Sequence, residues 1–72
     1  MNICDAKLNY LYEIKNISAN SEMKEFLFSL GCFEGEQISI IKIMPSNFII
    51  NIKGVRYAID KNLGNIIELR GE

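Results

Sequence analysis

The sequence contains no histidine and no tryptophan, and it has only one proline among its 72 residues. Without histidine, the chain lacks the side chain that most often acts as a general base or binds a transition metal near neutral pH. It also lacks a glycine-rich phosphate loop and a nucleophile elbow of the GxSxG type. We therefore expect no catalytic residue and a protein that is not an enzyme.

The chain also has little excess charge. Eight basic and nine acidic residues give a formal net charge of −1, and no run of one sign occurs along the sequence. Affinity for nucleic acid comes mainly from clustered lysine and arginine side chains that release counterions. We therefore expect no binding to DNA or RNA.

Long apolar segments are missing as well. The longest one, Ile38 to Met44, is interrupted by Ser39 and Lys42, whereas a helix needs about 20 apolar residues to span a bilayer. The N-terminus has no basic stretch followed by an apolar core, so the sequence predicts no signal peptide. We expect a cytoplasmic protein without direct membrane insertion, with its two cysteines reduced.

The remaining composition is that of one small globular domain. Apolar residues make up 49% of the chain and charged residues 24%, which are ordinary values for a folded domain. A chain of this length has room for a single hydrophobic core. We therefore expect one domain over residues 1–72.

The first periodic segment runs from Leu8 to Ile17. Apolar side chains occur at every second position, and polar ones are among those between them. A period of two with aromatic and β-branched residues is typical of a strand, with these side chains on its apolar face: Leu8, Tyr10, Tyr12 and Ile14.

A short helix is predicted next, from about Glu22 to Leu30. Asn20 or Ser21 is placed to accept hydrogen bonds from the first free amides, and Gly31 allows the left-handed conformation that ends a helix. The apolar residues of this segment fall at the spacing of one helical face, which we expect to be buried; they are Met23, Phe26, Leu27 and Leu30.

Gly35 marks a turn before a second strand, Glu36 to Met44. Its apolar phase changes after Ile40, which predicts a bulge or bend at that residue. The clearest hairpin follows, with alternating strands on either side of a turn at Gly54. An irregular or 3₁₀ turn is expected after it, followed by a last strand; the remaining predicted ranges are Phe48–Lys53, Val55–Asp60, Asp60–Asn65 and Ile66–Leu69.

The predicted fold is mainly β, with five strands and one short α-helix between strands 1 and 2. One short helix cannot cover both faces of a five-stranded sheet. We therefore expect the sheet to curl into a small barrel that is plugged by this helix.

These residues resemble a known family. The segment 26–35, Phe-Leu-Phe-Ser-Leu-Gly-Cys-Phe-Glu-Gly, is similar to the FeoA signature, in which a helix ends in an apolar residue and a glycine. Three further features follow in the family's order: the Met44-Pro45 pair, the hairpin at 50–59 and the closing strand at 65–69. The resemblance covers roughly residues 14–69.

This resemblance implies an SH3-like barrel. It also implies a small cytoplasmic accessory protein of bacterial ferrous iron uptake, which acts on the membrane transporter FeoB, whose G domain drives or gates transport. The same fold occurs as the C-terminal domain of iron- and manganese-dependent repressors. A metal-sensing, regulatory domain of that type is therefore the alternative.

Metal ligands and cofactors are not indicated by the residues themselves. Carboxylates occur at Glu22, Glu25 and Glu36, but none has a spacing that is diagnostic of a metal site. We expect Cys32 to be a small buried apolar residue, since free cysteine is commonly buried. The sequence therefore predicts no metal site and no cofactor.

A partner-binding surface is the better-supported hypothesis. Phe28 lies about 150° around the helix from the centre of the apolar face, so it is exposed unless a following loop covers it. Phe33 lies next to the same helix end, and the two rings can form one patch. With Lys24, Glu25 and Glu34 they give the apolar centre and charged rim of a modest protein interface. An aromatic groove for proline-rich peptides is the other possibility, but the tyrosines are expected in the core. The oligomeric state stays open.

Overall fold

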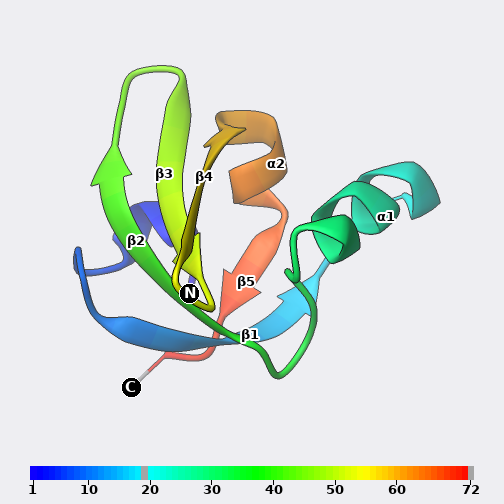
Figure 1. The fold of residues 1–72 in the computed structure, drawn as a ribbon, viewed down its shortest axis with the longest axis horizontal. Coiled ribbons are helices and arrows are strands. Elements are labelled where there is room, and N and C mark those ends of the chain that lie inside the picture. The colour runs from blue at the N-terminus through cyan, green and yellow to red at the C-terminus, as the bar shows by residue number, and fades with distance from the viewer. Residues whose placement is uncertain (19, 72) are drawn as a thin grey trace.

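A computed structural model of the chain describes residues 1–18 and 20–71. Five antiparallel strands form one sheet in the order β4-β3-β2-β1-β5 (Figure 1). The elements in chain order are η1 (Ile3–Asp5), β1 (Leu11–Ile17), α1 (Ser21–Ser29), β2 (Gln37–Ile43), β3 (Asn47–Ile52), β4 (Val55–Asp60), α2 (Lys61–Asn65) and β5 (Ile67–Leu69). The mainly β architecture with five strands is as predicted.

The sheet bends over itself without closing into a complete barrel. β4 and β5 lie at the two ends of the strand order and are not paired with each other. β1 spans the bend, because its first half pairs with β2 and its second half pairs with β5. The register shifts between Ile14 and Asn16 at this bend. A second register shift, between Ile40 and Lys42 in β2, confirms the predicted bulge.

The core lies inside this bent sheet. Alternate residues of β3 are buried, with Phe48 and Ile50 fully so, and Cys32 is also buried as expected. The buried apolar residues form one cluster: Ile3, Tyr12, Ile14, Ile17, Leu27, Cys32, Ile38, Ile40, Phe48, Ile50, Ile52, Ile59, Ile67 and Leu69. The alternation in the sequence therefore identified most of the core.

The predicted hairpin is present with a two-residue turn. Lys53 and Gly54 both have positive φ, at 53° and 82°. This backbone is that of a type I′ turn, which matches the twist of the strands it joins. Gly54 supplies one of the two unusual conformations, and the turn lies where the sequence predicted it.

The first predicted strand begins too early. β1 starts at Leu11, and both Leu8 and Tyr10 are exposed rather than in the core. Asn9 has φ of 67°, and its N–H donates to Ile40 O at 2.8 Å, so residues before Leu11 form a turn against β2. The alternation of apolar side chains continues through this turn by coincidence. Periodicity alone does not reveal a residue with positive φ.

Helix α1 forms where it was predicted, but its packing differs. The Asn20 side chain caps it by accepting a hydrogen bond from Met23 N at 2.9 Å. Leu27 is its only fully buried residue, and Phe26 of the expected apolar face is 50% exposed. The reason is that α1 lies beside the sheet rather than plugging it (Figure 1).

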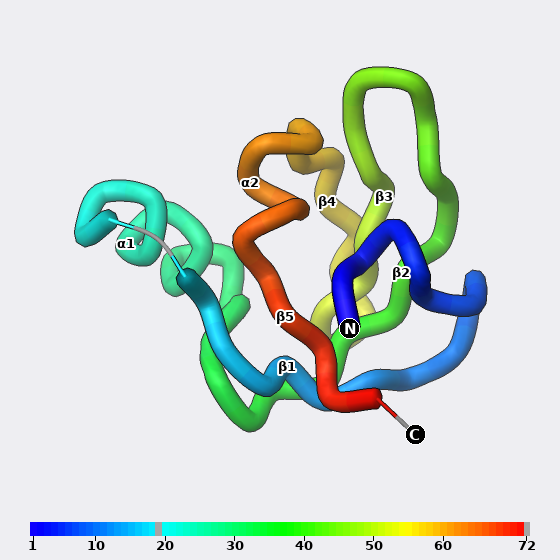
Figure 2. The backbone as a smooth tube through the Cα atoms, turned by 180° about the vertical axis from the view of Figure 1, so that it is seen from behind, coloured from blue at the N-terminus to red at the C-terminus, as the bar shows by residue number. Residues whose placement is uncertain are grey.

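The single predicted helix was expected to plug the barrel, and α2 takes this place instead of α1. The segment predicted as an irregular or 3₁₀ turn is a short α-helix, because Asp60 caps it and accepts a hydrogen bond from Leu63 N at 2.8 Å. α2 contacts β3, β4 and β5, and its Gly64 is buried against the Phe48 ring. It therefore covers the opening between the two end strands (Figure 2).

The N-terminal segment is part of the fold, which the sequence did not predict. The Met1 ammonium donates to Leu69 O at 2.6 Å, and Leu69 N donates to Met1 O at 2.7 Å. Asn2 pairs with Glu68, and Ile3 of η1 is fully buried. These contacts place the first residues along β5 (Figure 2).

Candidate functional site

A pocket of about 280 Å³ opens between α1 and the loop that follows it. Its lining comes from three parts of the chain: the end of β1, the helix itself and residues 33–34 of the loop. The lining residues are Ile17, Lys24, Phe28, Phe33 and Glu34. Four of the five residues that the sequence predicted for a partner-binding surface are therefore brought together around one hollow.

The two phenylalanines form the apolar part of the pocket. Phe28 is 53% exposed and Phe33 is 38% exposed. Their ring centroids lie 6.2 Å apart with an interplanar angle of 88°, which is an edge-to-face contact. Such a pair contributes about 0.5 to 1.5 kcal/mol beyond the area it buries, so the rings hold each other in place although both face solvent.

The end of α1 fixes this arrangement. Gly31 has φ of 91°, and two hydrogen bonds close the helix: Gly31 N donates to Phe28 O and Cys32 N donates to Leu27 O, both at 2.9 Å. This pattern is a Schellman motif. Leu27 and Cys32 are both fully buried, so the motif anchors the loop and leaves Phe33 on the surface.

The other end of the loop is hydrogen-bonded to β1. Gly35 has φ of 89°, and its N–H donates to Ile14 O at 2.8 Å. Ile14 N donates in turn to Glu36 O at 2.8 Å, and Glu36 N donates to Phe33 O at 3.1 Å. The loop that carries Phe33 and Glu34 is therefore hydrogen-bonded to α1 at its start and to β1 at its end.

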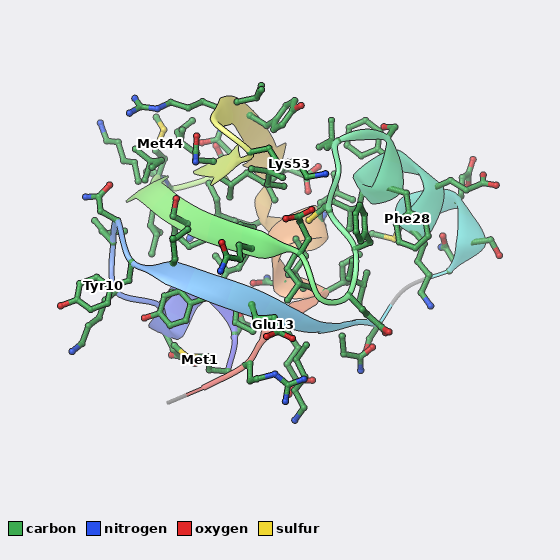
Figure 3. The ribbon with its side chains drawn as sticks, turned by 60° about the horizontal axis from the view of Figure 1, so that its bottom comes forward. Met1, Tyr10, Glu13, Phe28, Met44 and Lys53 are labelled. Atoms are coloured by element: carbon green, nitrogen blue, oxygen red, sulfur yellow. The ribbon has the colours of Figure 1, made fainter. Side chains whose placement is uncertain are left out.

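A lysine from a distant part of the sequence reaches the pocket rim. Lys53, in the β3–β4 turn, places its Nζ 5.6 Å from the centroid of the Phe33 ring and 3.2 Å from the Glu36 carboxylate. The N–H of Gln37 donates to Glu36 Oε1 at 3.0 Å; this bond and the Lys53 ammonium lower the pKa of Glu36. Figure 3 shows Phe28 on the helix and Lys53 extending toward the same loop.

The predicted site residues are not all equivalent in the structure. Lys24 and Glu34 line the pocket, whereas Glu25 is exposed on α1 and does not. Sequence reasoning missed Ile17 and Lys53, which no local pattern connects to the helix end. Their only sequence signals are the apolar end of one strand and the turn of the hairpin.

The two cysteines differ in their surroundings, and the buried one, Cys32, does not have those of a reactive thiol. Burial raises the pKa of the Cys32 thiol to about 12, and the negative charge of Glu36 adds to the rise. Cys4 is exposed in η1, with its Sγ 3.9 Å from Asn65 Oδ1. Across residues 1–18 and 20–71, no three side chains of His, Cys, Asp or Glu are grouped so that they could hold a metal ion. No helix in this part of the chain is long and apolar enough to cross a membrane.

A second pocket, of about 260 Å³, lies where the N-terminal residues meet β5. It is lined by Met1, Asn2, Ser18, Asn65, Ile66, Ile67 and Glu68. It contains no aromatic side chain, and Glu68 is paired with Lys15 at 3.7 Å. The first pocket is therefore the better candidate for binding a protein partner, because interfaces are enriched in aromatic residues.

Known proteins share this fold over nearly the whole chain. A crystal structure of an iron uptake regulatory protein (FeoA) has a TM-score of 0.88 and 25% identity, and the match covers 97% of this chain and 95% of the other. The solution structure of iron(II) transport protein A from Clostridium thermocellum has a TM-score of 0.86 and 22% identity, covering 96% of this chain and 44% of that longer one. No curated protein matches the sequence.

A third structure bears directly on the fold. FeoA from Stenotrophomonas maltophilia, in complex with zinc, is a prokaryotic SH3 domain protein; its TM-score is 0.79, at 16% identity over 97% of this chain and 89% of that one. The SH3-like fold expected from the sequence is thereby confirmed. A family model for the FeoA domain matches residues 1–70. The chain belongs to the FeoA family, which is associated with ferrous iron transport.

Proposed function

We propose that this chain is a non-catalytic accessory module of ferrous iron uptake, which binds the cytosolic G-domain region of the transporter FeoB. Membership of the FeoA family supports the link to iron transport. The observation that supports a binding role most directly is the Phe28–Phe33 pair, which is exposed at the pocket. The loop that carries Phe33 is hydrogen-bonded at both of its ends. On this proposal the protein acts in the cytoplasm as a single domain over residues 1–72.

The pocket has the chemistry of a modest protein interface. Its centre is aromatic, and charged groups surround it: Lys24 and Glu34 in the lining and Lys53 over the Phe33 ring. Binding hot spots combine an aromatic centre with a rim that excludes water. A module without catalytic groups acts on a transporter by binding one of its states more tightly than another.

Phe28→Ala tests this function. Since Phe28 is exposed, its removal should cost no more stability than its edge-to-face contact with Phe33, less than about 1.5 kcal/mol, and should weaken binding to the FeoB cytosolic domain by about 1 to 2 kcal/mol. Phe26→Ala is the matched control, because Phe26 lies on the same helix and is 50% exposed but does not line the pocket. Calorimetric titrations with GDP and with a GTP analogue measure both variants.

Two results would contradict the proposal. The first is equal binding by wild type, Phe28→Ala and Phe26→Ala, which would place the interface elsewhere. The second is no binding by the wild type in any nucleotide state, together with unchanged iron uptake in a deletion strain.

A further inference from the structure

Among the described residues, 1–18 and 20–71, β4 has one edge that faces no other strand. In the β3–β4 hairpin, Ile52 and Val55 flank a two-residue turn. Hydrogen-bonded pairs alternate along antiparallel strands, starting with the pair that flanks such a turn, so every second residue of β4 bonds to β3. The N–H groups of the residues between them point away from the sheet; these residues are Arg56, Ala58 and Asp60.

The residues of this edge lie at the surface of the protein. Arg56, Ala58 and Asp60 are all exposed, and no hydrogen bond within residues 1–18 and 20–71 uses the outward N–H of Arg56 or Ala58. The opposite end of the sheet differs, because Met1 is hydrogen-bonded to Leu69 of β5. Backbone groups available for a further strand are therefore concentrated on β4.

The side chains along this edge are complementary to themselves. Residues 56, 58 and 60 share one face of the strand and are basic, small and acidic in turn. We consider β4 of a second copy placed antiparallel to this strand, with the two Ala58 residues opposite each other. In this register each Arg56 lies opposite the partner's Asp60. A two-fold axis at Tyr57 would instead set Arg56 opposite the partner's Ala58 and lose this pairing.

We propose that β4 pairs with β4 of a second copy of this chain, antiparallel, about a two-fold axis at Ala58. Ala58 N–H donates to the partner's Ala58 C=O, and Asp60 N–H donates to the partner's Arg56 C=O. The Asp60 carboxylate is available for the side-chain pair, because one of its oxygens accepts from Leu63 N at 2.8 Å, while the other accepts no hydrogen bond from the part of the chain that the structure describes. The two sheets then form one continuous sheet, an isologous arrangement typical of dimers.

Sedimentation of the full chain over a range of concentrations tests the association. The wild type should shift from monomer to dimer as concentration rises. Arg56→Glu sets two carboxylates opposite each other and should weaken dimerisation at least about tenfold. Lys42→Glu makes the same charge change at an exposed site on β2 and should leave dimerisation unchanged.

Cross-linking tests the register. In a Cys4→Ser background, Ala58→Cys places two thiols directly opposite, with Cα atoms about 5.5 Å apart, which suits a disulfide. Arg56→Cys is the matched control on the same strand, because its two copies lie roughly 13 Å apart in this register. Mild oxidation should link Ala58→Cys roughly tenfold faster or more, owing to the high local concentration of thiols.

Several outcomes would overturn the proposal. A wild type that stays monomeric up to millimolar concentration would do so, as would equal cross-linking rates for the two cysteine variants. Faster linkage of Arg56→Cys would show another register. Protection of the Arg56 and Ala58 amides from hydrogen exchange only when the FeoB domain is added would show that the edge receives a partner's strand instead of a second copy.

Discussion

Gly64 of α2 packs directly against the ring of Phe48, so closely that a Cβ at this position would overlap the ring. Phe48 is fully buried in the core of the sheet. Gly64 is present for this close approach and not for its backbone freedom, since its φ is not positive. The contact is what brings α2 over the opening between β4 and β5.

Gly64→Ala should therefore destabilise the protein by about 1 to 3 kcal/mol, although alanine has the better helix propensity. Chemical denaturation measures the change. Gly71→Ala is the control, because a Cβ there meets only the Met1 sulfur at 4.0 Å. An unchanged midpoint for Gly64→Ala would mean that α2 does not pack as described.

Gly31 requires its left-handed backbone. With φ of 91° it closes the Schellman motif, and a side chain in this conformation costs about 1 to 2 kcal/mol. Gly31→Ala should lower the free energy of unfolding by this amount. Gly31→Asn should cost less, because asparagine tolerates the left-handed region better. Equal losses of stability for the two variants would mean that the new side chain's contact with Ile52, and not backbone strain, causes the loss.

Leu27 and Phe28 are neighbours with opposite environments. Leu27 is fully buried, so Leu27→Ala should cost about 2 to 5 kcal/mol of stability. Phe28→Ala removes the larger side chain but should cost less than about 1.5 kcal/mol, the size of its edge-to-face contact. Thermal melts of both variants measure the difference. A larger loss of stability for Phe28→Ala than for Leu27→Ala would show that the Phe28 ring is buried in the folded protein and fills the pocket.

The stability of the loop after α1 should depend on pH through Glu36. The Gln37 N–H and Lys53 lower the pKa of Glu36 in the folded protein below its ordinary value of 4.5. A depressed pKa contributes stability that is fully present above about pH 4.5 and is lost as the pH falls through the folded value. Wild type should therefore exceed Glu36→Gln in melting temperature at pH 7, and the difference should shrink below pH 4.5. A difference that stays constant down to pH 3 would contradict this assignment.

The two cysteines should react at very different rates. Because Cys32 is buried and its pKa is raised to about 12, a thiol reagent should modify only Cys4 in the folded protein. In denaturant both should react. Absorbance with an aromatic disulfide reagent counts the accessible thiols, and mass spectrometry identifies them. Rapid modification of Cys32 in the native state would show that the helix end opens readily.

Much of the fold could be predicted because local patterns encode it. The change of apolar phase after Ile40 indicated the bulge, and Asn20 and Gly31 indicated the ends of α1. Where α1 packs could not be predicted, because a periodic apolar face does not say which surface will cover it. Phe26 is exposed for this reason. The N-terminal turn at Asn9 was missed because alternating side chains on either side of it imitate a strand.

The candidate site was predictable in part for the same reason. Phe28 falls outside the apolar face of its own helix, so helical geometry predicted that the helix does not bury it, while whether the following loop covers it was left open. Phe33 follows closely in sequence, and the Schellman motif brings it back to the helix. Lys53 and Ile17 reach the pocket only through sheet pairing, and a single sequence gives no measure of such long-range contacts.

The pairing of β1 with β5 also sets the order in which the molecule assembles. β2, β3 and β4 are joined by short turns, so their contacts form without closing long loops. Ile17 must instead find Ile67 near the other end of the chain, and contacts of such separation form slowly. Ile17 also lines the pocket beside α1. We therefore expect the hairpins to form first during folding, and the pocket beside α1 to be completed only in the last step.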